Sequence, residues 1–281
     1  MDSTYGPSCP QVDISAPCTP GGATNPIIPE VPEPTSEDCL FLDIYVPRSA
    51  WESQSMPNTP VVVWIYGGAY AFGSKNTAPT PFYNATGLIQ TGSQSPFGGN
   101  FIFVTGNYRL GAFGWLAGST MESKALPNAG LYDQKLVLEW VQNYIHLVGG
   151  NSSDVSAWGE SAGASSILHH LISYNGKKDP LFKKAVTQSP AFQWQWDRNG
   201  TLESVFANFT TLANCTYTSN ALTCLQKAST DTLALANQQL FAETFSCTGI
   251  MPMGHSLDGN LIQHLAPVAL YNGTSSCHTS W

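Results

Sequence analysis

Charged residues are scarce in this chain of 281 residues, because Asp, Glu, Lys and Arg together make up only 11% of it. An average soluble domain carries about 25%. The net charge is −8, and no run of lysines or arginines forms a local basic patch. Phosphate backbones and anionic lipid surfaces attract proteins through such patches, so this composition argues against nucleic acid as a partner and predicts a largely neutral, polar surface.

The sequence also contains no long hydrophobic run, and its first residues do not have the pattern of a signal peptide. No apolar run approaches the roughly 20 residues that a membrane helix needs, so we predict no integral membrane association. The first residues, Met1-Asp-Ser-Thr-Tyr-Gly-Pro7, have neither the basic nor the apolar region of a signal peptide.

Seven cysteines and six Asn-x-Ser/Thr sequons nevertheless fit an oxidising, glycosylating compartment. The sequons begin at Asn84, Asn151, Asn199, Asn208, Asn214 and Asn272. We therefore predict a secreted or extracellular protein, although the printed chain shows no signal peptide. The odd number of cysteines leaves one without an intramolecular partner in any pairing.

Hydrophobic residues make up 42% of the chain, which is enough for a globular core. Apolar runs predict strands at residues 39–46, 60–66 and 101–109, and two shorter segments, 154–158 and 184–188, are interpreted as two further strands. The run Pro60-Val-Val-Val-Trp-Ile-Tyr66 is apolar on both faces, which is typical of a strand buried inside a parallel sheet.

Helical periodicity appears between these strands. The residues Tyr132, Leu136, Trp140, Tyr144 and Val148 recur every four positions, and they predict an amphipathic helix of about five turns that ends before Gly149-Gly150. A second helix is predicted over 161–172. Strands that alternate with helices predict an α/β fold, with a mostly parallel sheet and helices on both faces.

The two ends of the chain differ from this middle part. Residues 1–36 hold eight of the 19 prolines, which predicts an extended surface segment. The sequence of residues 197–281 predicts a variable, cap-like helical part built mainly from short polar helices. We find no linker that would separate a second domain, so residues 1–281 are predicted to form part of a single domain.

The stretch Gly159-Glu-Ser-Ala-Gly163 lies between a predicted strand and a predicted helix. A turn this tight requires glycine, because larger side chains at Gly159 and Gly163 would collide with the neighbouring strand and helix. The turn lifts Ser161 above the sheet, and the N–H of Ala162 at the helix start faces the position of a developing oxyanion. The pattern therefore predicts that Ser161 is a nucleophile and that no metal or cofactor is needed.

A second glycine-rich stretch, Gly67-Gly-Ala-Tyr-Ala-Phe-Gly73, directly follows the buried strand 60–66. A catalytic serine needs further N–H donors for its oxyanion, and bare backbone at a strand's carboxyl end supplies them. Gly68 and Ala69 are the candidate donors. The stretch would otherwise be a simple turn, and its place in the strand–helix order beside the serine motif favours the oxyanion hole.

Four blocks of sequence together resemble the type B carboxylesterase and cholinesterase family of the α/β-hydrolase fold, which includes fungal lipases. The blocks are Glu37-Asp-Cys-Leu-Phe-Leu-Asp-Ile-Tyr-Val-Pro47, Val63-Trp-Ile-Tyr-Gly-Gly-Ala-Tyr70, Asn107-Tyr-Arg-Leu-Gly-Ala-Phe-Gly114, and Asn128-Ala-Gly-Leu-Tyr-Asp-Gln134 leading to Gly159-Glu-Ser-Ala-Gly163. The match runs from about residue 5 to 196 and returns briefly at Leu257-Asp-Gly259. It implies a carboxylic ester hydrolase that forms an acyl-enzyme from a small ester with a hydrophobic acyl group.

The same resemblance implies roles for individual residues. Ser161 would be the nucleophile, and Gly68, Ala69 and Ala162 would donate the oxyanion-hole hydrogen bonds. Two disulfides are implied, Cys9 with Cys39 and Cys215 with Cys224, while Cys18, Cys247 and Cys277 stay unassigned. The aromatic run that ends at Trp196 falls where relatives line the acyl pocket, so Trp194 and Trp196 are candidates for that lining, with a buried structural role as the alternative for each.

The partners of the nucleophile are not found. On this fold the order is serine, acid, then histidine, and the family's acid and histidine lie well beyond the match at Asp258-Gly259, whereas only 22 residues follow Gly259. We expect both partners to be absent from this chain, which resembles an N-terminal and central portion of the fold. Glu160 is expected to be a buried structural carboxylate, and Asp258 does not match the catalytic acid.

None of the six histidines matches the family's base. Those on predicted helices, His146, His169 and His170, are expected to be structural or superficial. The other three, His255, His264 and His278, follow Ser161 in the required order only. Two alternatives to an active esterase therefore stay open, a non-catalytic cholinesterase-like binding module and a truncated or mis-spliced product. The sequence does not indicate an oligomeric state.

Overall fold

The computed structural model of the protein is built on a five-stranded sheet whose strands follow the order β1-β3-β2-β4-β5. The structure describes residues 6–14, 35–52, 55, 58–76, 83–94, 99–192, 195–215 and 220–276. The strands are β1 (Leu42–Tyr45), β2 (Thr59–Ile65), β3 (Ile102–Gly106), β4 (Gly150–Glu160) and β5 (Lys184–Gln188). Only the pairing of β1 with β3 is antiparallel. All five predicted strands are present, and the mostly parallel order confirms the predicted fold class.

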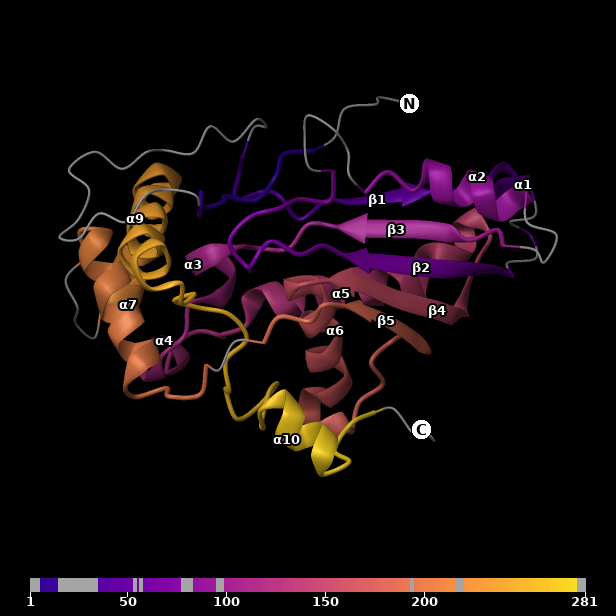
Figure 1. Cartoon of the computed structure of the whole chain (residues 1–281). Helices are drawn as coiled ribbons and strands as arrows, with labels where there is room; N and C mark the ends of the chain where they lie inside the picture. The colour runs from indigo at the N-terminus through magenta and orange to yellow at the C-terminus, as the bar shows by residue number, and fades with distance from the viewer. Residues whose placement is uncertain are drawn as a thin grey trace.

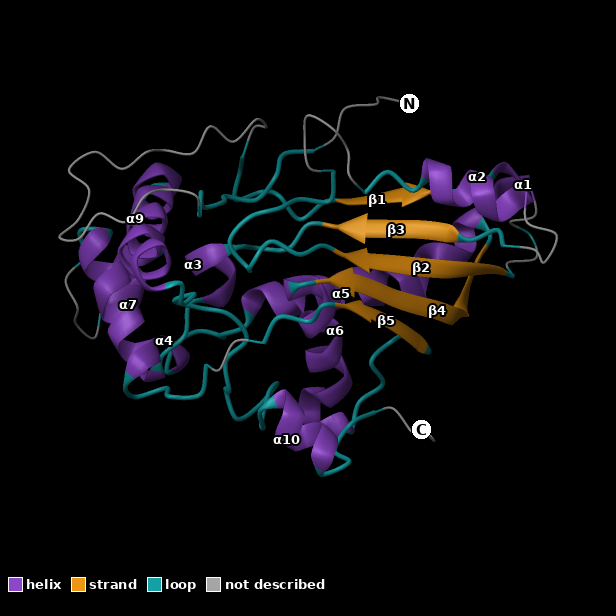
Figure 2. Ribbon diagram, viewed as in Figure 1, coloured by secondary structure: helices purple, strands orange, loops and turns teal. Residues whose placement is uncertain are grey.

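The helices lie on both faces of this sheet and beyond one of its ends (Figures 1 and 2). They are α1 (Arg48–Glu52), α2 (Thr86–Gln94), α3 (Gly111–Trp115), α4 (Ser119–Glu122), α5 (Ala129–Tyr144), α6 (Ala162–Ile172), α7 (Thr201–Leu212), α8 (Ala221–Leu225), α9 (Thr230–Thr248) and α10 (Ala266–Tyr271). Short 3₁₀ turns follow α5 and α6. In Figure 1 the helices α3, α7 and α9 gather beyond the carboxyl ends of the parallel strands, which is where ligands bind in α/β sheets.

The alternation of side chains along β2 supplies two apolar cores. Val61, Val63 and Ile65 join the large core on the side of α5 and α6, whereas Val62 packs with Phe103 under the start of α2. All four β2 side chains are buried. The continuous apolar run in this strand is therefore buried on both faces, as the sequence predicts.

The buried face of α5 differs from its most regular sequence pattern. The residues that repeat every four positions lie partly in solvent, with Leu136 56% and Tyr144 49% exposed. The deeply buried apolar side chains are instead Leu131, Leu138 and Val141. A four-residue spacing drifts around a helix of 3.6 residues per turn, so this series leaves the core-facing stripe.

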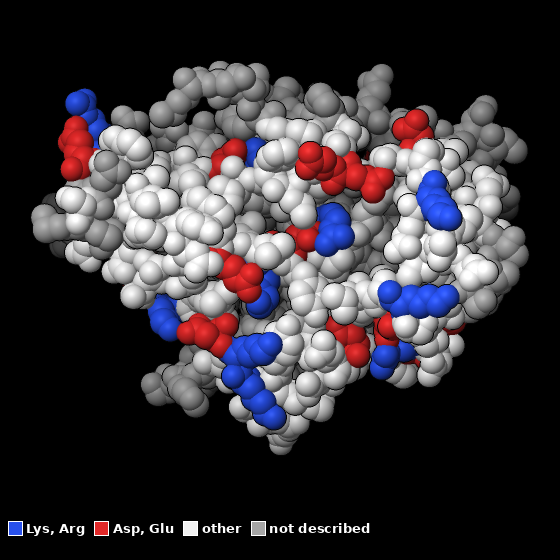
Figure 3. Space-filling model, turned by 180° about the vertical axis from the view of Figure 1, so that it is seen from behind, with Lys and Arg blue, Asp and Glu red and all other residues white. Residues whose placement is uncertain are grey.

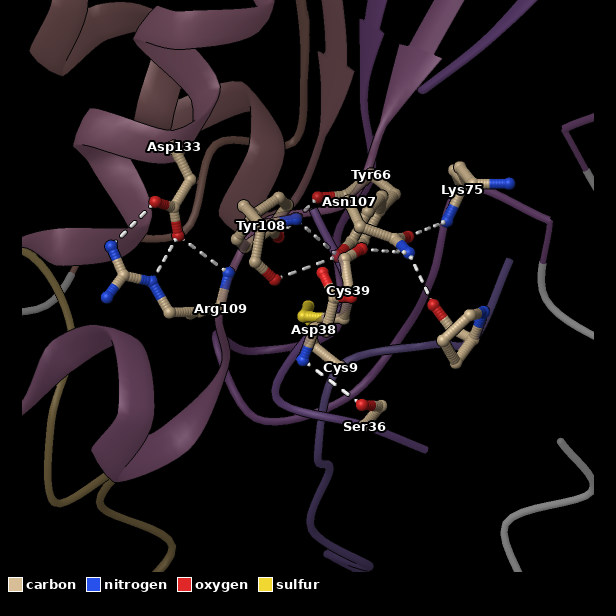
Figure 4. The surroundings of a disulfide bond; sticks show 11 residues. Cys9, Ser36, Asp38, Cys39, Tyr66, Lys75, Asn107, Tyr108, Arg109 and Asp133 are labelled. Atoms are coloured by element: carbon tan, nitrogen blue, oxygen red, sulfur yellow. Dashed lines mark hydrogen bonds and ion pairs between the residues drawn. A yellow bond between two sulfur atoms is a disulfide. The ribbon is translucent and has the colours of Figure 1, made fainter. Parts of the chain in front are cut away.

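Part of the proline-rich N-terminal segment is buried, which corrects the prediction of a surface segment. Residues 1–5 and 15–34 lie outside the described residues, but Cys9 and Val12 are buried. Cys9 forms a disulfide with Cys39, and Val12 N–H donates to Ala71 O at 2.9 Å. These links hold residues 6–14 against the body of the domain, and Figure 4 shows the surroundings of the disulfide.

Residues 197–276 contain the helices α7, α8, α9 and α10 joined by loops, and α9, with 19 residues, is longer than the short helices predicted for this part. It packs against α7 through buried side chains that include Phe206 and Phe241. The predicted Cys215–Cys224 disulfide is present, and Cys18 and Cys277 lie outside the described residues.

Charged side chains stand mostly as small, separate groups on the face in Figure 3, with broad uncharged areas between them. This arrangement agrees with the low charge content of the sequence. None of the helices in the described ranges combines the length and the apolar character needed to cross a membrane.

Candidate active site

Ser161 occupies a strained turn between the last residue of β4 and the first residue of α6. Its backbone angles are φ 53° and ψ −118°, a region that residues with a side chain seldom adopt and that costs about 1–3 kcal/mol. Surrounding hydrogen bonds hold the turn, because Ser161 N–H donates to Gln188 O at 2.9 Å and Ser161 O accepts from Ala191 N–H at 3.2 Å. Such strain is typical of a nucleophile elbow.

The positions of Gly159 and Gly163, on either side of Ser161, have no room for a side chain. A Cβ on Gly163 would lie 2.0 Å from Ile65 O, a backbone atom of β2. A Cβ on Gly159 would lie 2.8 Å from the carbonyl carbon of Gly163. The start of α6 therefore packs directly on β2, in a contact that only glycine permits.

The loop after β2 touches this elbow. A Cβ on Gly67 would lie 3.1 Å from the Cβ of Ser161, so the two segments are in van der Waals contact. Gly68, Ala69 and Tyr70 follow with φ values of 108°, 58° and 62°. In the part of the chain that the structure describes, the N–H groups of Gly68, Ala69 and Ala162 donate to no protein acceptor. Free N–H donors from both segments thus flank the serine.

The histidines are divided between the surface and one buried cluster. His146 and His264 are exposed, and His278 lies outside the described residues. His169, His170 and His255 are buried, and burial lowers the pKa of His169 to about 4 and that of His170 to about 3. Within the described ranges no histidine hydrogen-bonds to Ser161, and no three His, Cys, Asp or Glu side chains converge as a metal site would.

Two carboxylates near the motifs have different surroundings. Glu160 is exposed, which corrects the expectation of a buried carboxylate. It ends β4 beside β5, a strand whose residues are mostly exposed, so its side chain reaches solvent at the rim of the sheet. Asp258 accepts from Asn128 Nδ2 at 2.9 Å and from the N–H groups of Asn260 and Ile262, a set of contacts typical of a structural turn.

Over residues 3–279 the sequence matches the profile of the Carboxylesterase family. The chain belongs to the carboxylesterase family. A secreted lipase of Arthroderma benhamiae is 41% identical over 273 residues, covering 97% of this chain and 50% of the relative. Carboxylesterase patB of Aspergillus clavatus is 38% identical, covering 81% of this chain and 40% of the relative, and Lipase 1 of Geotrichum candidum is 35% identical, covering 82% and 41%.

Solved structures of esterases have the same fold. A PNB esterase superposes with a TM-score of 0.76 at 28% identity, covering 96% of this chain and 50% of that protein. EstA of Aspergillus niger gives a TM-score of 0.76 at 30% identity, covering 96% and 47%. The chain spans about half the length of the relatives it matches.

One ion pair joins two of the sequence blocks on which the resemblance to carboxylesterases rests. Arg109 Nε and Nη2 each lie 2.7 Å from a carboxylate oxygen of Asp133, and Arg109 N–H donates to the same carboxylate at 3.0 Å (Figure 4). The pair joins the segment after β3 to the start of α5. This bidentate contact positions the two segments on one side of the carboxyl ends of the strands.

The acyl-pocket candidates stay a prediction. Trp196 is 59% exposed, so its ring is not the buried structural side chain that was the alternative. Trp194 lies outside the described residues.

Sequence reasoning missed a cluster beneath the elbow. Tyr70 is buried, and its hydroxyl hydrogen-bonds to Ser165 Oγ and donates to Ala191 O at 2.9 Å. The rings of His255 and Trp115 pack against the Tyr70 ring. The sequence offers only a weak signal for this cluster, since its members come from five separate segments.

Proposed function

We propose that this chain supplies the nucleophile and the oxyanion hole of a carboxylic ester hydrolase. The observation that supports this most strongly is the contact between the elbow at Ser161 and the loop of Gly67, Gly68 and Ala69. Neither segment has another evident reason for its backbone strain. The names of the relatives, lipases and carboxylesterases, support the same class of reaction.

In the proposed reaction Ser161 Oγ attacks the ester carbonyl carbon while its proton passes to a base. The electron pair of the carbonyl bond moves onto the oxygen, where the N–H groups of Gly68, Ala69 and Ala162 stabilise the negative charge. The tetrahedral intermediate expels the alcohol with the proton and leaves an acyl-enzyme, which water then hydrolyses. The helix dipole of α6 adds positive potential at the oxyanion.

The proposed substrate is a small ester with a hydrophobic acyl group. Ala69 carries a methyl group that a glycine would lack, and this methyl group would narrow the space beside the scissile carbonyl. The exposed Trp196 is the described candidate for contact with the acyl chain.

One observation favours the alternative of a non-catalytic carboxylesterase-like chain. The base and its carboxylate are not found at Ser161 among the described residues. Without a base, turnover would fall by about 10⁴- to 10⁶-fold while the oxyanion hole would still contribute.

Labelling with a fluorophosphonate probe separates these possibilities. We expect the folded wild-type chain to bind one equivalent of probe and the Ser161→Ala variant to bind none. Ser204→Ala is the matched control, because Ser204 is an exposed serine on α7, outside both motifs. Absence of labelling in folded wild-type protein, judged by intact-mass spectrometry, would contradict the enzyme proposal for this chain.

We also propose that the chain is secreted and N-glycosylated. The relative named a secreted lipase and the two disulfides support this. The structure distinguishes two groups of sequons. Four asparagines are exposed, Asn84, Asn199, Asn214 and Asn272. Asn151 and Asn208 are half-buried, and Asn208 Nδ2, the atom that would carry a glycan, donates to Glu243 Oε2.

Mass spectrometry after enzymatic glycan release tests this assignment. We expect deamidated asparagine at Asn84 and Asn272 in protein from the culture medium, and unmodified Asn151 and Asn208. Recovery of the chain from the cytosolic fraction without glycans would contradict secretion.

A further inference from the structure

The oxyanion loop, residues Gly67 to Tyr70, has a positive φ at three consecutive residues and is strained at two of them, so it requires support. Gly68, Ala69 and Tyr70 all have positive φ, although two of them carry a Cβ. Backbone contacts supply part of the support, because Ala71 and Phe72 N–H donate to Gly68 O at 2.9 and 3.0 Å. Loops in such conformations keep them only when the surrounding structure holds them firmly.

The side chain of Tyr70 supplies the rest by joining three segments around the nucleophile. Its hydroxyl donates to Ala191 O at 2.9 Å and hydrogen-bonds to Ser165 Oγ on α6. Both partners are tied to the elbow, since the N–H groups of Ser165 and Ala191 donate to Ser161 O. One phenol therefore links the loop with Gly68 and Ala69 to the helix with Ala162, which are the two halves of the proposed oxyanion hole.

The Tyr70 ring is held by a stack of imidazoles. His255 lies edge-on to it with ring centroids 4.8 Å apart, and Trp115 packs against it at 5.0 Å. His255 in turn stacks on His169 at 3.9 Å with an interplanar angle of 13°. His169 is itself a residue of α6, and its Nδ1 is 2.7 Å from Ser165 O on the same helix.

The hydrogen bonds determine the protonation of both imidazoles. A carbonyl oxygen only accepts, so His169 carries its proton on Nδ1. Ser166 Oγ donates to Ala162 O, and it therefore accepts from His255 Nε2 at 3.2 Å. His255 Nδ1 is then a bare buried nitrogen, and it has no hydrogen-bond partner in the described part of the chain.

We propose that Tyr70 is a positioning residue for the oxyanion hole, and that the stacked His169–His255 pair makes this support sensitive to acid. The proposal rests on the proposed function, because the oxyanion hole belongs to that site. A proton on either imidazole would place a positive charge in a buried pocket, where the two ring centroids are 3.9 Å apart. On His255 the proton would bind at Nδ1, which has no hydrogen-bond acceptor among the described residues. Acid would therefore release the ring of Tyr70 and with it the loop.

The neighbouring basic groups oppose a proton in this pocket. Lys135 on α5 is positively charged, His170 on α6 becomes positive only when it is protonated, and the Tyr70 hydroxyl is neutral. The carboxylate of Asp258, three residues after His255, already accepts hydrogen bonds from Asn128 Nδ2 and from two backbone N–H groups. Burial lowers the pKa of His255 well below its usual range, with a smaller contribution from His169.

Two variants of buried tyrosines test the positioning role. Tyr70→Phe removes only the hydroxyl, and Tyr66→Phe is the matched control because its buried hydroxyl bonds to the backbone of Tyr108 and not to α6. For Tyr70→Phe we expect the rate constant of the fluorophosphonate reaction to fall by about 10- to 100-fold while the affinity for the probe stays unchanged, since misplaced catalytic groups cost up to about 100-fold. Equal slowing in both variants would show a merely structural effect and overturn the proposal.

Amide hydrogen exchange tests the same point without relying on labelling. In Tyr70→Phe we expect the amides of Ala71 and Phe72 to exchange roughly 5-fold faster, as loss of one buried hydrogen bond predicts, while amides of α5 report global opening. Unchanged exchange at these two amides would overturn the positioning role. A wild-type chain that is not labelled contradicts the proposed function instead, and exchange still decides whether Tyr70 holds the loop.

The acid sensitivity needs its own variant. His255→Phe keeps a flat ring but cannot take a proton. Between pH 7 and 5 we expect exchange at Ala71 and Phe72, corrected for intrinsic rates, to rise in wild type and to rise clearly less in His255→Phe, where His169 and His170 still titrate. The same pH profile in both proteins would overturn the acid-sensitive part.

Discussion

Gly163→Ala is expected to unfold far more readily than the wild-type chain. The added Cβ would lie 2.0 Å from Ile65 O and 2.7 Å from Tyr66 O, and both are backbone atoms at the end of the central strand β2. β2 cannot move away from the added methyl group without losing its pairing with β3 and β4, and α6 cannot move without losing its contacts with the sheet. Overpacking at such a site costs about 3 kcal/mol or more, a large part of a typical stability of about 5–15 kcal/mol.

Urea unfolding monitored by tryptophan fluorescence measures this loss. Gly87→Ala is the matched control, because Gly87 lies in α2 and an added Cβ would meet nothing within 4 Å. We expect that control to be as stable as wild type or more stable, since alanine favours the helix. Equal midpoints for Gly163→Ala and wild type would disprove the close packing of α6 on β2.

The second large effect is a loss of stability in acid. In the folded chain burial lowers the pKa of His169 to about 4, of His170 to about 3, and of His255 well below 6.5. In the unfolded chain all three titrate near pH 6.5. As the pH falls below 6.5 the unfolded state gains protons that the folded state cannot take up, so the free energy of unfolding decreases.

Each histidine contributes a slope of about 1.4 kcal/mol per pH unit in this range, so three give up to about 4 kcal/mol per unit. The loss begins at about pH 6.5 and ends only when the folded histidines take up protons, at about pH 4 for His169 and about pH 3 for His170. Urea titrations at pH 7, 6 and 5 measure the slope. His169→Gln should remove about a third of it, whereas the exposed His264→Gln should leave it unchanged. The same slope in wild type and His169→Gln would contradict burial of a neutral imidazole.

Much of the fold follows from local patterns. The sequence predicts all five strands, and most clearly β2, because a strand buried on both faces requires apolar side chains at consecutive positions. Two helices, α5 and α6, follow from periodicity and from the glycines that end or precede them. The orientation of α5 does not follow, since Leu136 and Tyr144 are as apolar as the buried Leu138 and only the neighbouring sheet selects which side is covered.

The N-terminal segment shows the opposite error. Prolines predict an irregular backbone, and an irregular backbone is usually superficial. Residues 6–14 are irregular, yet residues 8–10 and 12 are buried and the others half-buried, because the Cys9–Cys39 disulfide and the contact of Val12 with Ala71 hold them in place. Composition cannot report where a distant cysteine will lie.

In the site, the amino-acid sequence alone predicts the elbow around Ser161, because the tight turn and its two glycines belong to one short segment between a strand and a helix. The glycine-rich loop and the family membership can be read in the same way, from short blocks whose spacing is local. The Tyr70 junction, the neutral imidazole stack and the exposure of Glu160 could be known only after folding. Burial, hydrogen-bond pairing and the resulting pKa depend on which remote segments share a pocket, and these contacts join residues nearly two hundred positions apart in the chain.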